Sequence, residues 1–186
     1  MFYKLRDGVI MNGHRPSDLD ISKSAVSNPT LYMLIGAPAT GKSTWVMRYR
    51  QVMKRPAIIY STDDYIEMLA EETSDTYNNV FNSTNMKQAE LWAEQNLKIA
   101  IKNELDIIWD QTNLNKKSRK KKLAKIPTHY TKIAVVFNLP PITEWELRLE
   151  SRPGKMIPRA VLDSMIFSFE YPTLGEGFYK IITGHL

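Results

Sequence analysis

The segment "GAPATGKS", from Gly36 to Ser43, constrains the fold of this chain more than any other feature. It fits the pattern G-x-x-x-x-G-K-[ST], and it stands between an apolar run, "TLYMLI", and a helix-forming run, "KSTWVMRYRQVMKR". A strand that leads into such a loop and then into a helix directs several backbone N–H groups, and the positive end of the helix dipole, at one point. The segment therefore predicts a phosphate-binding loop within an α/β fold.

Apolar strands and helices alternate along the rest of the chain. We expect further strands within 56–62, 105–110, 132–139 and 176–184. Helices are expected within 63–72, 86–104 and 116–126, a polar loop at 73–85, and two helical segments on either side of Pro153-Gly154. Strands that are apolar throughout need cover on both faces, which helices around a parallel sheet provide. The pattern predicts a three-layer α/β fold with a mainly parallel sheet.

Residues 1–30 differ in character from the rest of the chain. Asp7-Gly8 lies between two short apolar runs and suits a tight hairpin turn, and a polar stretch connects this hairpin to the first strand of the alternating pattern. We therefore expect residues 1–30 to form an appended hairpin and linker. Residues 31–186 would form the main domain.

The composition limits the kinds of metal site and of binding partner that we expect. The chain has no cysteine, and its three histidines are scattered, so we expect neither disulfides nor thiolate metal sites, and any metal ion should be bound by oxygen atoms. A net charge of +5 and a pI near 9.3 mildly favour a polyanionic partner. No run reaches the roughly 18 apolar residues that a transmembrane helix needs. A cytoplasmic protein without membrane contact is expected.

The phosphate-binding loop also assigns roles to its residues. Lys42 would neutralise the phosphate charge, the Ser43 hydroxyl would bind Mg²⁺, and Thr44 would reach the α-phosphate. The backbone of the loop would surround the phosphates. The whole expected binding set is Gly36, Ala39, Thr40, Gly41, Lys42, Ser43 and Thr44. The pattern indicates that the chain binds a nucleoside triphosphate such as ATP.

Acidic residues end two of the expected strands. Ligands of such folds bind beyond the carboxyl ends of the strands, so Asp63 in "STDDY" and Asp110 in "DIIWD" should lie near the phosphates. Asp63 and Asp64 could cap the helix that comes after them, or one of them could accept a proton from a substrate. Asp110 could contact the metal ion through water, or it could cap the next turn.

Four motifs in order resemble one known family. The segments "GAPATGKSTW", "STDDY", "DQTNLN" and "RPGKMIPRAVLDSM" are similar to those of the kinase half of the bacteriophage polynucleotide kinase-phosphatase, a P-loop kinase. The resemblance covers about residues 31–183. It implies a P-loop kinase fold with a helical lid. It also implies transfer of the ATP γ-phosphate to the 5′-hydroxyl end of DNA or RNA, in nucleic-acid repair.

The resemblance also implies roles for single residues. Asp63 matches the general base of the family, and Lys42 and Ser43 match its phosphate-binding lysine and metal-binding neighbour. Arg152 and Arg148 match two lid arginines, and their i, i+4 spacing would place them on one face of a helix. A closing lid would then bring both to the transferring phosphate.

Other residues are expected on the acceptor side. Thr112 and Asn113 match the family's D-x-T-N segment, in which Asp110 takes the acidic position. Tyr65, Tyr77 and Phe81 are candidates for stacking on a nucleobase.

Two positions depart from the family, because Thr62 and Ile66 replace arginines that flank its base. A small-molecule kinase that acts on a nucleoside, nucleotide or sugar is therefore an alternative. A non-catalytic ATP-binding module is another. The basic segment 116–125 could follow a nucleic-acid backbone or form a solvated helix face.

Overall fold

A computed structural model of the chain describes residues 3–6, 9–13, 28–52, 55–84, 86–152 and 155–184. Strands β1 (Tyr3–Arg6) and β2 (Val9–Gly13) pair antiparallel, as a hairpin requires. The expected turn at Asp7-Gly8 and most of the expected linker lie outside the described residues. The division of the chain at residue 30 therefore stays a prediction.

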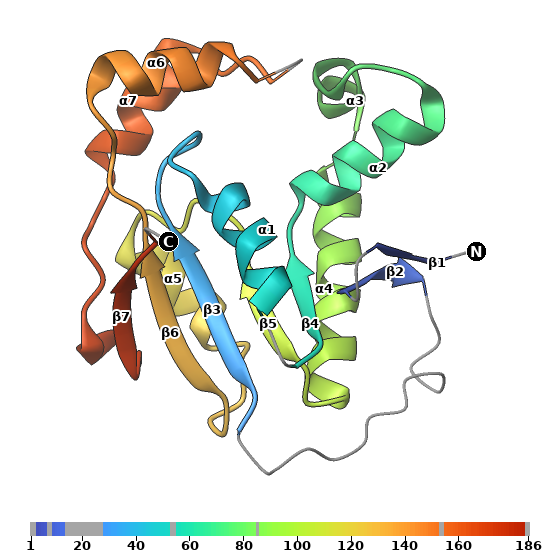
Figure 1. Ribbon diagram of the computed structural model, residues 1–186, viewed down its shortest axis with the longest axis vertical. Helices are drawn as coiled ribbons and strands as arrows, with labels where there is room; N and C mark the ends of the chain where they lie inside the picture. Colours follow the sequence, from blue (N-terminus) through green and yellow to red (C-terminus); the bar gives the residue numbers. More distant parts are fainter. Residues whose placement is uncertain are drawn as a thin grey trace.

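Five strands form the central sheet: β3 (Thr30–Ile35), β4 (Ala57–Tyr60), β5 (Asp106–Trp109), β6 (Thr131–Val136) and β7 (Lys180–Thr183). Their order across the sheet is β4-β5-β3-β6-β7, and every neighbouring pair is parallel. The strand with the phosphate-binding segment at its carboxyl end, β3, is the middle strand (Figure 1). The expected parallel α/β sheet is confirmed.

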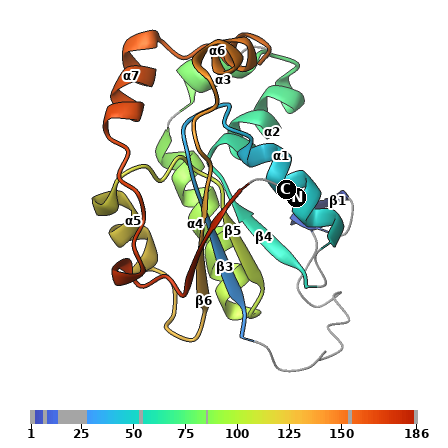
Figure 2. The ribbon, with the colours of Figure 1, turned by 60° about the vertical axis from the view of Figure 1, so that its left-hand side comes forward.

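Helices cover both faces of the sheet, as the apolar strands require. Helix α1 (Lys42–Val52) packs Trp45 and Val46 against one face, while α4 (Met86–Lys102) and α5 (Lys116–Leu123) pack against the other. Figure 2 shows α1 and α4 on opposite sides of the strands. Trp45 and Trp109 are buried in these two layers. The three-layer arrangement is confirmed.

Three more helices lie beyond the carboxyl ends of the strands. They are α2 (Asp63–Thr73), α6 (Ile142–Glu150) and α7 (Arg159–Phe167), and the last two form the expected helical lid (Figure 1). A 3₁₀ turn, η2 (Leu174–Glu176), precedes β7. None of the described helices is both long and apolar enough to cross a membrane.

The prediction of a polar loop at 73–85 is wrong in part, because helix α3 (Tyr77–Ser83) forms within this range. The Thr76 side chain caps this helix by accepting a hydrogen bond of 3.3 Å from the backbone N–H of Asn79. Val80 is buried, and α3 packs against α2. A cap and one buried apolar residue outweigh the weak helix propensity of the asparagines.

Candidate active site

One large pocket lies beyond the carboxyl ends of the strands. Its volume is about 1850 Å³, and its walls come from the phosphate-binding loop, α2, α3, the loop after β5 and the lid. The pocket brings together most of the residues expected to act: Thr40, Lys42, Ser43, Asp63, Asp110, Thr112, Arg148 and Arg152. Segments that are far apart in the sequence therefore converge on one space, where the sheet topology predicts a ligand site.

The phosphate-binding loop depends on its two glycines in different ways. A Cβ atom on Gly36 would lie 2.8 Å from both the Phe137 Cβ and the Thr40 Oγ1, so no side chain fits there. Gly41 has a φ of 102° and open space around it, so the backbone conformation rather than crowding favours glycine. Ala39 also has a positive φ, 60°. The loop is therefore closely packed at Gly36 and open at Gly41, where phosphates would lie.

Lys42 lies at the centre of the loop. Its ammonium donates hydrogen bonds to the carbonyls of Gly36 (2.9 Å) and Ala37 (2.7 Å). Burial lowers the pKa of Lys42 to about 8, the negative charge of Asp110 opposes this shift, and the positive charge of Arg152 adds to it. A cation whose charged form is destabilised by burial gains from an anionic ligand, and a polyphosphate is such a ligand.

Ser43 and Thr44 are at the start of α1, where a phosphate-bound metal ion would lie. Asp110 lines the same pocket, and burial raises the pKa of its carboxyl while the Lys42 charge lowers it. Within the described ranges, no three His, Cys, Asp or Glu side chains converge into a metal site. The residues present fit a metal ion held by one hydroxyl, one carboxylate and the phosphates of a nucleotide.

The adjacent carboxylates Asp63 and Asp64 lie in different environments. Asp63 begins α2, and its side chain is 55% exposed, with one oxygen 4.0 Å from the Lys155 Nζ. Asp64 is partly buried, and its backbone N–H donates to the Ser61 Oγ at 3.2 Å. Burial raises the pKa of Asp64 to about 6, although a side-chain hydrogen bond with Ser61 acts in the opposite direction. Asp63 is the more accessible to a substrate.

The loop after β5 brings Asp110, Gln111 and Thr112 to the pocket. The Gln111 amide donates to the Thr62 Oγ1 at 3.3 Å, so this loop contacts the start of α2. Asn113 lies elsewhere, because it is only 1% exposed and its side chain donates to the carbonyl of Leu34 at 2.6 Å. Its expected contact with substrate stays a prediction. In this structure its side chain stabilises the loop by donating hydrogen bonds to backbone carbonyls.

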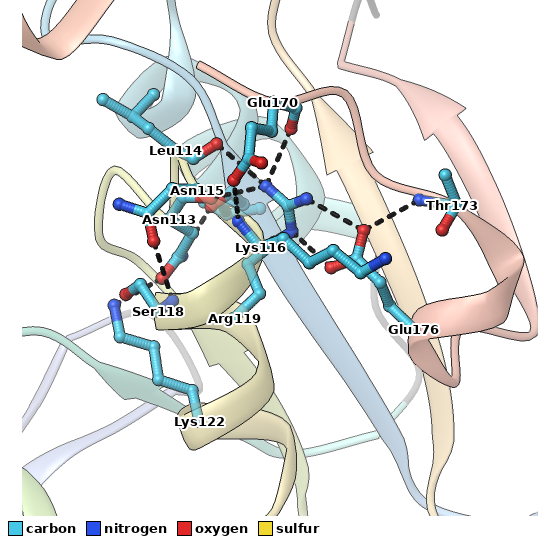
Figure 3. A network of polar contacts seen from close by, with 11 residues as sticks. Asn113, Leu114, Asn115, Lys116, Ser118, Arg119, Lys122, Glu170, Thr173 and Glu176 are labelled. Atoms are coloured by element: carbon cyan, nitrogen blue, oxygen red, sulfur yellow. Dashed lines mark hydrogen bonds and ion pairs between the residues drawn. The ribbon is translucent and has the colours of Figure 1, made fainter. Parts of the chain in front are cut away.

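Arg119 forms hydrogen bonds with the other end of this loop, at Asn113 and Leu114 (Figure 3). Its fully buried guanidinium donates to both carboxylate oxygens of Glu176, at 2.8 and 2.9 Å. It also donates to the carbonyls of Asn113 (3.1 Å), Leu114 (2.9 Å) and Glu170 (2.9 Å). One side chain thus joins α5, the loop after β5 and the segment before β7. Sequence reasoning missed Arg119, because it stands within a run of lysines.

The rest of the basic segment forms α5 as expected. Lys117, Lys120 and Lys121 are exposed, whereas Lys122 turns inward and donates to the Asn113 Oδ1 at 2.6 Å. Whether the exposed lysines contact a nucleic-acid backbone stays a prediction.

The two lid arginines do not share a helix face, which corrects the expectation from their spacing. Helix α6 ends at Glu150 and is capped at Ser151, so Arg152 lies beyond it. Arg148 remains on the helix, where it donates to Glu144 at 2.6 Å. The Arg152 Nη1 is buried and has no hydrogen-bond partner among the described residues. A buried donor of this kind in a phosphate-binding pocket suits an anionic oxygen.

The aromatic candidates separate into two groups. The Tyr65 ring packs against Trp92 of α4, with 5.7 Å between the ring centroids, and Tyr65 is not among the residues that line the pocket. Tyr77 and Phe81 on α3 do line it, and their rings are stacked with centroids 5.9 Å apart. Burial, the charge of Asp63 and a hydrogen bond with Asp63 raise the pKa of Tyr77. Tyr77 is therefore coupled to the expected base.

Comparison with known proteins completes the description of the site. A family profile described as "AAA domain" matches residues 31–172, and no curated protein sequence matches the chain. A chain in the structure of the Pnkp1/Rnl/Hen1 RNA repair complex is 20% identical, with a TM-score of 0.61. The match covers 78% of this chain and 45% of that one, so this chain spans less than half of its length.

Two further solved structures are similar. A fungal RNA kinase is 12% identical with a TM-score of 0.55, and the match covers 85% of this chain and 75% of that one. A gluconokinase from Sinorhizobium meliloti 1021 is 12% identical with a TM-score of 0.49, covering 85% and 83%. At these identities, the similarity to the chain of the RNA repair complex and to the fungal RNA kinase establishes the fold and nothing about the substrate. The similarity to the gluconokinase is too weak to support a conclusion.

Proposed function

This chain belongs to the AAA domain family, with a P-loop kinase fold, and on that premise we propose that it is an ATP- and Mg²⁺-dependent polynucleotide 5′-hydroxyl kinase. The acceptor would be the 5′-hydroxyl end of DNA or RNA, and the role would be the repair of nucleic-acid ends. The observation that most supports a phosphotransferase is that Asp63, an exposed carboxylate, shares a pocket with Lys42 and Arg152.

The proposed mechanism assigns one step to each side chain. The Asp63 carboxylate accepts a hydrogen bond from the acceptor hydroxyl and takes its proton as the new P–O bond forms. The bond between the γ-phosphorus and the oxygen bridging it to the β-phosphate breaks, and ADP leaves with that electron pair. Lys42 and the buried Nη1 of Arg152 stabilise the negative charge on the phosphoryl oxygens during this transfer.

Ser43 and Asp110 are the residues that would hold Mg²⁺, one by its hydroxyl and the other directly or through water. The ion would supply further neutralisation of the phosphate charge. The raised pKa of the Asp110 carboxyl fits this role, because a nearby cation would favour its charged form.

The alternative of a small-molecule kinase has its own support. The wall of the pocket formed by α2 and α3 carries only acidic charged side chains, and its pocket-lining members are Asp63, Asp64, Glu67, Glu71 and Glu72. Carboxylates repel a polyanionic acceptor and tolerate a neutral sugar or nucleoside. Ile66 stands where the polynucleotide kinases that this chain resembles have an arginine. It is fully buried in the core, so its side chain cannot contact the acceptor.

A direct test offers γ-labelled ATP with a 5′-hydroxyl oligonucleotide, with the same oligonucleotide already 5′-phosphorylated, and with free nucleosides or sugars. The proposal expects label only on the 5′-hydroxyl oligonucleotide among the polymers. Transfer to a free nucleoside or sugar and not to the oligonucleotide would support the small-molecule alternative. Binding of ATP without transfer to any acceptor would support the non-catalytic module.

A further inference from the structure

The acidic wall raises a specific problem for a nucleotide acceptor. Between Arg55 and Lys87 the chain contains no lysine or arginine, so neither α2 nor α3 supplies a cation. A 5′-terminal nucleotide carries a phosphate on the 3′ side of its sugar, one sugar ring away from the hydroxyl that receives the phosphoryl group. That phosphate needs a positive partner close to Asp63, and the partner must come from another part of the fold.

Lys155 reaches this wall from the lid segment between α6 and α7. Its ammonium forms an ion pair with Glu67 and lies 4.0 Å from a carboxylate oxygen of Asp63. Its side chain is only 19% exposed. Glu67 is one helical turn after Asp63, so the Cβ atoms of the two residues lie about 5–6 Å apart on one face of α2. Lys155 therefore places one positive charge beside Glu67 and close to the expected base, Asp63.

An aromatic surface completes the surroundings of Lys155. Its ammonium lies over the Tyr77 ring at 4.3 Å from the centroid, and the Tyr77 ring stacks with that of Phe81. Phe81 is 42% exposed. A cation beside an aromatic pair, of which Phe81 is exposed and Tyr77 partly buried, matches the two chemical parts of a nucleotide, a phosphate and a flat base.

We propose that Lys155 binds the 3′-side phosphate of the acceptor nucleotide, and that Tyr77 and Phe81 form the platform on which its base stacks. This inference rests on the proposed 5′-hydroxyl kinase function and specifies how its acceptor is selected. Glu67 holds Lys155 in the free protein, and the acceptor phosphate replaces Glu67 as its partner. The enzyme then prefers an acceptor with a 3′-phosphate to the corresponding free nucleoside.

The test compares three acceptors with the full chain: a 5′-hydroxyl oligonucleotide, a nucleoside 3′-monophosphate and the free nucleoside. Lys155→Met is expected to raise KM for the two phosphate-bearing acceptors by about tenfold more than KM for the free nucleoside, because loss of the charge beside Asp63 affects all three acceptors alike. Arg159→Met is the matched control. It removes a lid cation that pairs with Glu146 and Asp163 and does not line the pocket, so all three acceptors should be unaffected.

Glu67→Gln separates phosphate binding from a purely structural ion pair. If Glu67 competes with the acceptor phosphate for Lys155, this variant lowers KM for the phosphate-bearing acceptors, and Lys155→Met in the same chain abolishes that gain. A structural pair would instead make both single variants less active on every acceptor.

Two outcomes overturn the inference, and they are distinguishable. An equal loss on the oligonucleotide and the free nucleoside in Lys155→Met would show that Lys155 only holds the lid, with the proposed kinase function intact. A wild-type chain that transfers label to none of the three acceptors would remove the proposed function itself, and this inference with it.

Discussion

The indole nitrogen of Trp145 on α6 donates a hydrogen bond of 2.8 Å to the carbonyl of Pro38 in the phosphate-binding loop. Trp145 is fully buried, and it packs with Ala37 and with Leu162 of α7. The base of the lid is therefore fixed to the loop that would hold the phosphates. Residues beyond the end of α6, Arg152 and Lys155 among them, extend from a fixed support over the pocket.

The unequal surroundings of the two lid arginines predict unequal effects. Arg152→Ala should lower kcat by about 100-fold or more and change ATP affinity far less, because its Nη1, which has no hydrogen-bond partner among the described residues, can stabilise charge that develops during transfer. Arg148→Ala should have a smaller effect, because Arg148 is already paired with Glu144. Steady-state kinetics with ATP titration measure both. Equal losses of kcat and ATP affinity in Arg152→Ala would indicate a plain binding role.

Asp63→Asn should lower kcat by about 100- to 10 000-fold while ATP binding is retained, since the amide cannot accept the proton of the acceptor. Turnover of labelled ATP and equilibrium binding of a nucleotide analogue are the two measurements. Asp64→Asn is the control at the neighbouring position, and we expect it to keep most of the activity. Full activity in Asp63→Asn would exclude Asp63 as the base.

Asp64→Asn should stabilise the protein at pH 8. Burial raises the pKa of Asp64 from 3.8 to about 6, so the folded state takes up a proton between these values, and the charged carboxylate destabilises it above about pH 6. The substitution removes this cost, which is at most about 3 kcal/mol for a shift of this size. Urea unfolding at pH 8 and pH 4.5 measures the gain, which should shrink at the lower pH. A gain independent of pH would assign it to another cause.

Glu176→Gln should destabilise the fold by about 3–5 kcal/mol, because it leaves the fully buried guanidinium of Arg119 without a negative partner. Chemical unfolding measures the loss. Glu146→Gln removes the carboxylate of an exposed pair with Arg159 and should leave stability almost unchanged, because solvent screens such pairs. Equal effects of the two substitutions would show that burial of the Arg119 pair contributes nothing.

Most of the fold can be predicted from local patterns. Each strand of the central sheet lies where an apolar run predicted one, and the Gly36–Ser43 loop lies between strand and helix as its glycines and Lys42 require. The exception is α3, whose asparagines resemble a loop and whose formation depends on burying Val80 against neighbouring elements. Such burial has no local signal in the sequence.

The sequence by itself determined the phosphate-binding loop, the alternation that builds a parallel sheet and the residue types that phosphoryl transfer needs, because these depend on neighbours in the chain. Only the tertiary structure decided that Asp63 is exposed while Asp64 is partly buried, that Arg152 lies past the end of α6, and that Lys155 pairs with Glu67. Identical or similar side chains differ in these cases by solvent access and by contacts across the fold. Those properties arise only when distant segments pack together.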